Sequence, residues 1–483
     1  MMQQTTRTAV EKVRRHFVNN DAQSLATALL ELRKLTYRNI DTCSATCGAA
    51  GGIGLLVRVL ERHCENGPVQ LLELALTTLQ DITFGNANNR VTCGLVGAVE
   101  AVVKVLECYS DGPTQLLQAA SWALCNIALG DAKNKVKLGA CGGVEALVKV
   151  VKSHRNGPAQ LLEATCAALC NIGLDAENQA KFGQAGGVEA LVAVLQHHPE
   201  GPHRLLEYAS RALTNMTMNT DNQVKCGQAG GIEILVDLTK RHRKGPASLL
   251  EATCAVLFNT TIVDNNKVRC GAAGGVETVV DVLTRHREGP TKLLEEACGA
   301  LFNFTAVPDN RVKCGAAGGV EVVTKIVKKH GKQPSRLLEN ACLALQNMTA
   351  NADNQAKCGD VGGVEALVHV VKWHNDGPNE LLENACAALS NITANSSNKV
   401  KCGAVGGVEA VVEVVKRHRN LPDKLVETAC RALRNLTFNN AGNQDKCRAA
   451  GGVEPLRTVV ERYALSPFVN VQASVALQNM KEE

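Results

Sequence analysis

Aromatic residues are scarce in this chain, and that scarcity restricts what can fill its interior. Only 3% of the 483 residues are Phe, Trp or Tyr, whereas 45% are hydrophobic. A core of this composition has to be built from Leu, Val and Ala, which are small enough to interdigitate without large rings. The composition therefore predicts an aliphatic core that is large for the length of the chain.

Long apolar runs, an apolar leader and a basic tract are missing as well. No run approaches 18 apolar residues, which disfavours a membrane-spanning helix, and Met2 stands where N-myristoylation needs glycine. We therefore expect no direct membrane anchor. With 52 basic and 47 acidic residues, the charge is nearly balanced, so no nucleic-acid partner is expected.

Cysteine, in contrast, is plentiful. Most of the 20 cysteines recur at two fixed positions of an internal repeat, where a helical array needs small apolar side chains. This placement favours reduced, buried thiols over disulfides. It predicts a cytoplasmic or nuclear protein.

A Leu-x-Asn step recurs every 44 or 45 residues, at the end of an amphipathic helix. Such a period is the signature of a solenoid in which each unit packs on its neighbours. The asparagines of this step are Asn126, Asn171, Asn215, Asn259, Asn303, Asn347, Asn391, Asn435 and Asn479, and Asp81 holds the position in the first copy.

The copy at 221–261 shows how one unit is built. Asn222 is expected to cap a short first helix, and Gly230-Gly231 to end it with a sharp turn into a second helix. Pro246 then starts a third helix, at a position where a fixed φ costs little. In that third helix, Leu250 and Leu257 belong to the core stripe, and Asn259 lies off it.

This unit resembles the armadillo repeat, most specifically at Ser121-Trp122-Ala123-Leu124-Cys125-Asn126-Ile127-Ala128, which is similar to the form found in nuclear import adaptors. The resemblance covers residues 40–482 as ten tandem repeats in one elongated domain, with residues 1–39 as a divergent helical cap. It implies an all-α fold, a right-handed α-solenoid whose third helices line a concave groove.

The recurring asparagines are the main candidate for function. An amide has a donor and an acceptor, so a row of them can hold the backbone of an extended peptide whatever its side chains. The candidate groove residues are therefore Asn126, Asn171, Asn215, Asn259, Asn303, Asn347, Asn391 and Asn435. The alternative is that these side chains only satisfy nearby backbone groups.

Eight residues before the asparagines lies a row of carboxylates, which would suit a basic ligand. Its candidate groove-rim members are Glu163, Glu207, Glu251, Glu295, Glu339, Glu383 and Glu427, with Gln118 as an exception. The plainer interpretation is that a carboxylate in the first turn favours the helix N-terminus. Both roles are compatible.

Specificity requires positions that differ between repeats. Trp122 stands four residues before its asparagine, and Phe258 and Phe302 lie beside Ala255 and Gly299, which suggests a shallow apolar pocket. Core packing is the alternative for the two phenylalanines. Arg431 and Arg434 make the last part of the groove more positive, either for an acidic ligand segment or as a solvated face.

No catalytic constellation stands out, so we expect no enzyme, no cofactor and no metal. Eight histidines also recur once per repeat, but that spacing is far beyond the roughly 2 Å reach of a shared metal. A cationic side chain at a helix C-terminus explains them.

The sequence therefore predicts a scaffold or adaptor that binds extended or helical segments of partner proteins. A nuclear import adaptor is the alternative suggested by Trp122 and Asn126, although residues 1–39 lack a dense basic arm. A membrane-associated or cytoskeletal organiser is a further alternative. Leu477 and Met480, on the last helix, predict apolar surface for end-to-end self-association.

Overall fold

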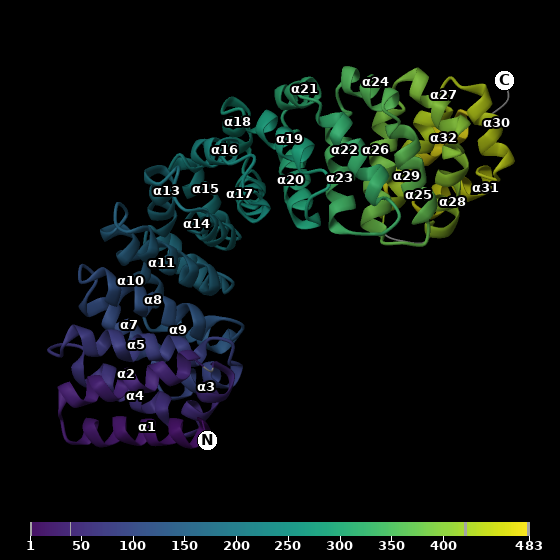
Figure 1. Ribbon diagram of the computed structural model, residues 1–483. Helices are drawn as coiled ribbons and strands as arrows, with labels where there is room; N and C mark the ends of the chain where they lie inside the picture. The colour runs from purple at the N-terminus through teal and green to yellow at the C-terminus, as the bar shows by residue number, and fades with distance from the viewer. Residues whose placement is uncertain (1, 39, 420–422, 481–483) are drawn as a thin grey trace. The chain divides into compact units, whose positions relative to one another are not determined.

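The computed structural model describes residues 2–38, 40–419 and 423–480. Within these ranges the chain forms 32 α-helices and no strand. It divides into two compact units, Met1–Leu238 and Thr239–Glu483. Inside each unit, helices that follow one another in the sequence stack as successive repeats (Figure 1). The prediction of an all-α solenoid is confirmed.

Two N-terminal helices, α1 (Met2–Val18) and α2 (Ala22–Arg38), precede ten three-helix repeats. The first helices are α3 (Ile40–Ala49), α6 (Ala87–Leu95), α9 (Ala132–Ala140), α12 (Ala176–Gln184), α15 (Thr220–Gln228), α18 (Asp264–Ala272), α21 (Pro308–Ala316), α24 (Ala352–Asp360), α27 (Ser396–Ala404) and α30 (Ala441–Ala449). The second helices are α4 (Gly52–His63), α7 (Ala98–Cys108), α10 (Gly143–Ser153), α13 (Gly187–His197), α16 (Gly231–Arg241), α19 (Gly275–Arg285), α22 (Gly319–His330), α25 (Gly363–Trp373), α28 (Gly407–His418) and α31 (Val453–Arg462). The third helices are α5 (Val69–Thr83), α8 (Thr114–Ala128), α11 (Ala159–Ile172), α14 (His203–Met216), α17 (Ala247–Thr260), α20 (Thr291–Phe304), α23 (Arg336–Met348), α26 (Asn379–Ile392), α29 (Asp423–Thr437) and α32 (Pro467–Gln478).

The turns between first and second helices follow the glycine pattern. Gly186, before α13, has φ 71°, a left-handed conformation that glycine adopts without steric cost. Two predicted helix starts need correction. Pro246 is the N-cap of α17, with an extended ψ of 137°, so the helix itself begins at Ala247. The N-cap of α15 is Asn219, whose side-chain oxygen accepts a hydrogen bond from the backbone N–H of Asn222.

Asn222 is instead buried, and it joins two repeats. Its Nδ2 donates to Gln179 O in the preceding repeat at 2.8 Å and to Met216 O, in the last turn of α14, at 2.9 Å. Its Oδ1 lies 1.9 Å from where a Cβ on Gly183 would be, so only glycine leaves room for this contact. Equivalent buried asparagines are Asn89, Asn134, Asn178, Asn310, Asn354, Asn398 and Asn443.

The predicted core stripe is confirmed, since Leu250, Cys254 and Leu257 are all fully buried. The cysteines are free thiols, and most are buried. Among the described residues no single helix is long and apolar enough to cross a membrane, and only the pair Asp41–Ala49 and Gly52–His63, bent by 71°, passes on length and composition.

Candidate functional site

Each asparagine of the Leu-x-Asn row with a described contact is tied to the repeat before it. Nδ2 of Asn171 donates to Cys125 O at 2.9 Å, and Nδ2 of Asn347 donates to Phe302 O at 2.9 Å. The acceptors lie in the last turn of the preceding third helix, where carbonyls lack partners within their own helix. The same bond is made by Asn126, Asn215, Asn303, Asn391, Asn435 and Asn479.

These bonds fix the amide nitrogens, and at some positions they leave the amide oxygen available. Among the described residues, no hydrogen bond reaches the Oδ1 of Asn171, Asn347 or Asn391, and these three side chains are half-buried. Asn126 and Asn303 are more enclosed, with 8% and 7% of their surface exposed. The amide nitrogen thus satisfies backbone within the solenoid, and the acceptor is the group left for a ligand.

The remaining asparagine of the prediction, Asn259, is half-buried near the end of α17. With it, each unit has asparagines of this row on its third helices. We call the half-buried side chains of the third helices within a unit the third-helix face.

The predicted row of carboxylates also lies half-buried on this face, and much of it is paired. Glu163 meets Arg204 of the next repeat at 3.1 Å, and Glu383 meets Lys424 at 2.7 Å. Glu295 contacts Lys292 at 2.6 Å, and Glu207 contacts Arg211, one turn away on its own helix, at 3.0 Å. All four pairs neutralise the acids, and the pairs of Glu163 and Glu383 also hold neighbouring repeats together.

Glu339 differs from those paired carboxylates. Burial, together with the negative charge of Glu380, raises the pKa of Glu339, and Arg336 opposes the rise. The guanidinium of Arg336 thus does not offset the burial of Glu339 and its repulsion by Glu380. Glu251 and Glu427 are half-buried on the same face.

Trp122 borders a pocket of about 330 Å³ in the first unit. The pocket lies among α2, α5 and α8, and its lining is Arg33, Thr77, Gln80, Gln115, Gln118, Ala119 and Trp122. Gln118 is the position where the carboxylate row is interrupted, so no ion pair with the next repeat closes the face here. The chemistry of the pocket is one indole, one guanidinium and neutral amides.

Two contacts hold the walls of this pocket. The Trp122 ring meets the edge of Tyr208, on α14, with ring centroids 6.3 Å apart. Arg33 pairs with Asp81 at 3.4 Å, and burial raises the pKa of that carboxyl despite the nearby guanidinium. Asp81 therefore replaces the asparagine of the other repeats with a charge that fixes Arg33 from α2.

The other variable positions lie on the third-helix face, and the side chains of Phe258 and Arg434 already have contacts there. The Phe258 ring covers Gly299, since a Cβ there would meet the ring at 2.9 Å, so the expected apolar hollow is filled by Phe258 itself. Phe302 is half-buried. Arg434 donates to Asn435 Oδ1 at 3.3 Å, which occupies the acceptor of that asparagine. Arg431 is half-buried, and its Nε has no hydrogen-bond partner.

Four of the recurring histidines have described bonds to the repeat before them, namely His198, His286, His374 and His418. Nε2 of His374 donates to Gly331 O at 2.7 Å, and Nε2 of His418 donates to Asn375 O at 2.8 Å. Within the described ranges, no group of three or more His, Cys, Asp or Glu is arranged to hold a metal ion. These four histidines act as hydrogen-bond donors to backbone carbonyls at the end of the second helix in the preceding repeat.

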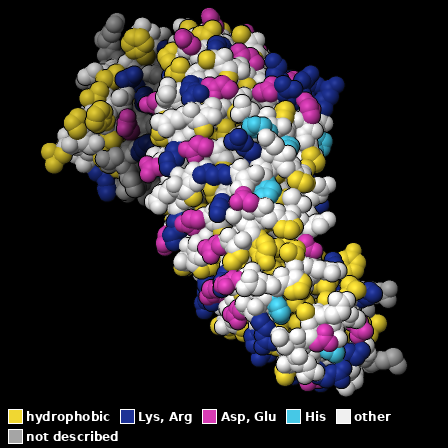
Figure 2. Space-filling view, turned by 90° about the vertical axis from the view of Figure 1, so that its left-hand side faces the viewer, with side chains coloured by type: hydrophobic (Ala, Val, Ile, Leu, Met, Phe, Trp, Pro, Cys, Tyr) yellow, Lys and Arg dark blue, Asp and Glu magenta, His cyan; other side chains and the backbone are white. Residues whose placement is uncertain are grey.

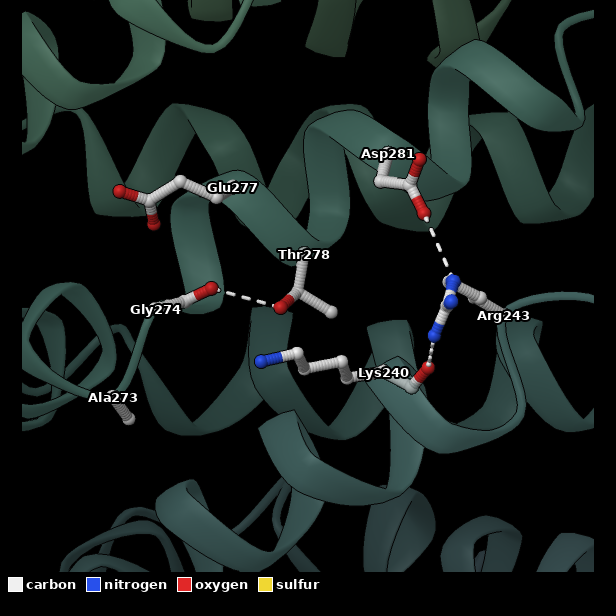
Figure 3. Close-up of a pocket in the computed structure, with 7 residues that line it drawn as sticks. All are labelled: Lys240, Arg243, Ala273, Gly274, Glu277, Thr278 and Asp281. Atoms are coloured by element: carbon white, nitrogen blue, oxygen red, sulfur yellow. Dashed lines mark hydrogen bonds and ion pairs between the residues drawn. The ribbon is translucent and has the colours of Figure 1, made fainter.

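A second pocket, of about 380 Å³, lies between second helices of the other unit (Figure 3). Arg243 bridges Lys240 O at 2.9 Å and Asp281 at 3.8 Å, and Thr278 donates to Gly274 O at 2.8 Å. Lysines at the same position elsewhere extend to the next repeat, as Lys372 does to Val405 O at 2.8 Å. The pocket thus lies where the lysine contact between neighbouring repeats is not made.

Charges of both signs are mixed over the surface in Figure 2. Basic and acidic side chains alternate on the described part of the face in view, and neither sign gathers into a broad patch. A surface of this kind gives no long-range attraction for a polyanion.

At the last repeat, Met480 is buried, so it does not supply the apolar surface expected from the sequence. Leu477 is half-buried. The exposed apolar side chains of this repeat are Leu465, Phe468 and Val471. End-to-end self-association stays a prediction, with these residues as its most exposed candidates.

Comparison with known proteins gives matches at the level of family and fold. Residues 19–301 match the family described as GAC ARM domain, and residues 351–394 match the armadillo/beta-catenin-like repeat. An engineered protein of known structure is 27% identical, with 89% of this chain and 99% of that chain covered and a TM-score of 0.73.

A chain from a structure of the interaction between cadherin and beta-catenin, controlled by a conserved phosphorylation switch, is 16% identical over 98% of this chain and 96% of its own, with a TM-score of 0.77. At that identity the likeness concerns the fold alone. None of the curated proteins matches the sequence.

Proposed function

The chain belongs to the armadillo-repeat family, through a GAC ARM domain match over residues 19–301, and on that premise we propose that it is a non-enzymatic scaffold for partner proteins. The binding surface is the third-helix face, and the ligand is an extended segment of the partner. Protein binding is consistent with the fold, and the choice of this face rests on the chemistry of its side chains.

The observation that supports this proposal most is the set of fixed amides. Because each Nδ2 is bonded to the preceding repeat, the side chain cannot rotate freely, and its oxygen keeps one direction. Acceptors held in place bind peptide amides without a further cost in side-chain ordering. Stacked helices lie about 8–10 Å apart and an extended chain rises about 3.3 Å per residue, so one acceptor serves about every third residue.

Selection among ligands is assigned to the interruptions of the repeat. The Trp122 pocket offers an indole surface for an apolar side chain, while Gln80, Gln115 and Gln118 can bond to the backbone around it. Farther along, in the second unit, the neighbouring carboxylates Glu339 and Glu380 offer negative charge to a basic residue. In this scheme, a segment bound by the first unit carries an apolar residue, and a segment bound by the second unit carries a basic one.

The test compares the two tryptophans of the chain. Trp122 lines the pocket of the third-helix face, whereas Trp373 lies on the second helix α25, with 45% of its surface exposed and its ring stacked on His369. Peptides selected from a display library against the intact chain should lose at least tenfold in affinity with Trp122→Ala and keep it with Trp373→Ala.

Circular dichroism would verify that both variants are folded. Equal losses in the two variants, or no loss in either, would reject the third-helix face as the binding surface. Peptides whose binding depends on Trp122 should also compete with one another, because they share one pocket.

A nuclear import adaptor is the second candidate, because Trp122 and Asn126 form its motif. A basic localisation peptide would need carboxylates beside that tryptophan, but the pocket presents Gln118 and Arg33 there. Fluorescence polarisation with a lysine-rich peptide distinguishes the two functions, since binding that depends on Trp122 would favour the import adaptor. Location in the cytoplasm or nucleus stays a prediction.

A further inference from the structure

Six cysteines depart from the two positions at which cysteine fills the core of the repeats, and two of these six touch each other. Cys64 follows α4, and Cys108 is the last residue of α7, one repeat later. Their sulfur atoms are 3.4 Å apart. Both belong to the first compact unit.

Farther along the chain, charged side chains join neighbouring repeats at this junction. Counted from the glycine that caps each second helix, Cys108 occupies the position of Lys329 and Arg417. These two cations form ion pairs with the preceding repeat, to Glu288 and Asp376. Both thiols therefore lie at a junction between repeats, where a stabilising link is usual.

The two thiols differ in exposure. Cys108 is exposed, whereas Cys64 has only 1% of its surface accessible. Burial and the hydrogen bond with Cys108 raise the pKa of Cys64 to about 12. Lys104 lies near both sulfur atoms, and its ammonium group pairs with Glu65 at 3.0 Å. A positive charge is therefore present beside any thiolate that forms.

We propose that Cys64 and Cys108 form an oxidisable dithiol, a modification site at which a hydroperoxide produces a disulfide between the first two repeats. Closing the bond requires the sulfur atoms to approach by about 1.4 Å, from their present contact to the roughly 2.05 Å of a disulfide. Rotation about the side-chain bond of the exposed Cys108 can supply much of this movement.

The chemistry proceeds in two balanced steps. The Cys108 thiolate attacks one oxygen of the hydroperoxide, the O–O bond breaks, and an alcohol leaves with the thiol proton, so that Cys108 becomes a sulfenic acid. The Cys64 sulfur then attacks the Cys108 sulfur, and the displaced hydroxide takes the Cys64 proton and leaves as water. Two thiols are oxidised by two electrons, and the peroxide is reduced. A dithiol reductant reverses the product by exchange.

The experiment treats the intact chain with hydrogen peroxide at a few equivalents, alkylates the remaining thiols, and maps linked peptides by mass spectrometry. We expect a 64–108 linked peptide, two hydrogens lighter than its parts, that disappears after reduction. In Cys64→Ser the second step is blocked, so a dimedone adduct should accumulate at Cys108. In Cys108→Ser neither product should form.

Cys125→Ser is the matched control, because Cys125 is also off the core positions and lies near another cysteine, Cys170, but is buried. It should give the same 64–108 linkage as the unaltered chain. Linkage of Cys108 to a second copy of the chain, or oxidation of other cysteines ahead of this pair, would overturn the proposal.

Discussion

The contact between a buried asparagine and a glycine of the preceding repeat leads to our sharpest prediction. In Gly139→Ala the new methyl group would lie 1.6 Å from Oδ1 of Asn178, so Asn178 has to move. It would then lose its hydrogen bonds to Lys135 O at 2.9 Å and Ile172 O at 3.2 Å. We therefore expect a substitution that normally favours a helix to destabilise this one.

The size of the effect follows from two opposing contributions. Two lost hydrogen bonds cost about 2 kcal/mol, since the net contribution of one bond is about 1 kcal/mol. The buried polar groups left without a partner add about 1 kcal/mol, so the total cost is roughly 3 kcal/mol. The helix preference of alanine over glycine returns up to about 1 kcal/mol. Gly139→Ala should thus lower local stability by about 2 kcal/mol.

A second background isolates the cause. In a chain that already carries Asn178→Ala, the added methyl group meets no amide, so Gly139→Ala should be neutral or stabilising by up to about 1 kcal/mol. Gly54, inside α4, has nothing within 4 Å of its Cβ position, and Gly54→Ala is the matched control that should stabilise. A change of sign between backgrounds is the result that identifies the contact.

Native-state hydrogen exchange on peptides from α9 and α12 is the suitable assay, because repeat proteins can unfold in segments and exchange reports each segment separately. Equal destabilisation of Gly139→Ala in both backgrounds would refute the reasoning, since Asn178 would then play no part.

Three further predictions follow from single contacts. Removing the ring in His374→Ala leaves Gly331 O without its 2.7 Å donor and should cost about 1–2 kcal/mol in urea unfolding, whereas His197→Ala, on an exposed ring, should cost less than about 0.5 kcal/mol. Because the folded-state pKa of Glu339 is raised, ionising it costs stability at neutral pH, and this cost disappears as the pH falls below the unfolded pKa of about 4.3. Glu339→Gln should therefore raise the melting temperature at pH 7 and leave it unchanged at pH 4; a rise of equal size at both values would contradict the assignment. Iodoacetamide should label the exposed Cys108 in the native chain long before Cys254, Cys342 or Cys386. Burial raises the pKa of each of those three thiols to about 12, so few of them are ionised and reactive. Early labelling of the three would contradict this prediction and show that the core opens.

The sequence was sufficient to predict the repeats, because ten copies of one pattern reinforce each other. The glycine turns and the leucine stripe depend on local conformation and helical period, and both are present in each repeat. The sequence predicts Asn222 as the cap of the short helix, whereas the structure has Asn219 there. Both residues are asparagines, and asparagine is favoured at an N-cap, so residue type alone could not distinguish them. Sequence alone could not show that Asn222 faces a glycine of another repeat.

The sequence predicts where the residues of the candidate site lie, but not which of their polar atoms are already bonded within the protein. The asparagines and glutamates lie on the face expected for them, but partners 41 to 46 residues away use many of their polar atoms. Such pairings depend on the lateral offset between neighbouring helices, which the repeat period does not determine. The Trp122 pocket combines residues of α2, α5 and α8, so its lining could not be read from one repeat.

The bonds between repeats also give the solenoid a polarity. Within each unit, most side-chain donors belong to the later repeat and the carbonyls that accept them to the earlier one, as with Asn171, Asn178, Lys181 and His198. A repeat grafted after an existing one would find its acceptors already in place, whereas one grafted in front must offer carbonyls in the correct register. Lengthening such a protein by duplication is therefore easier in one direction than in the other.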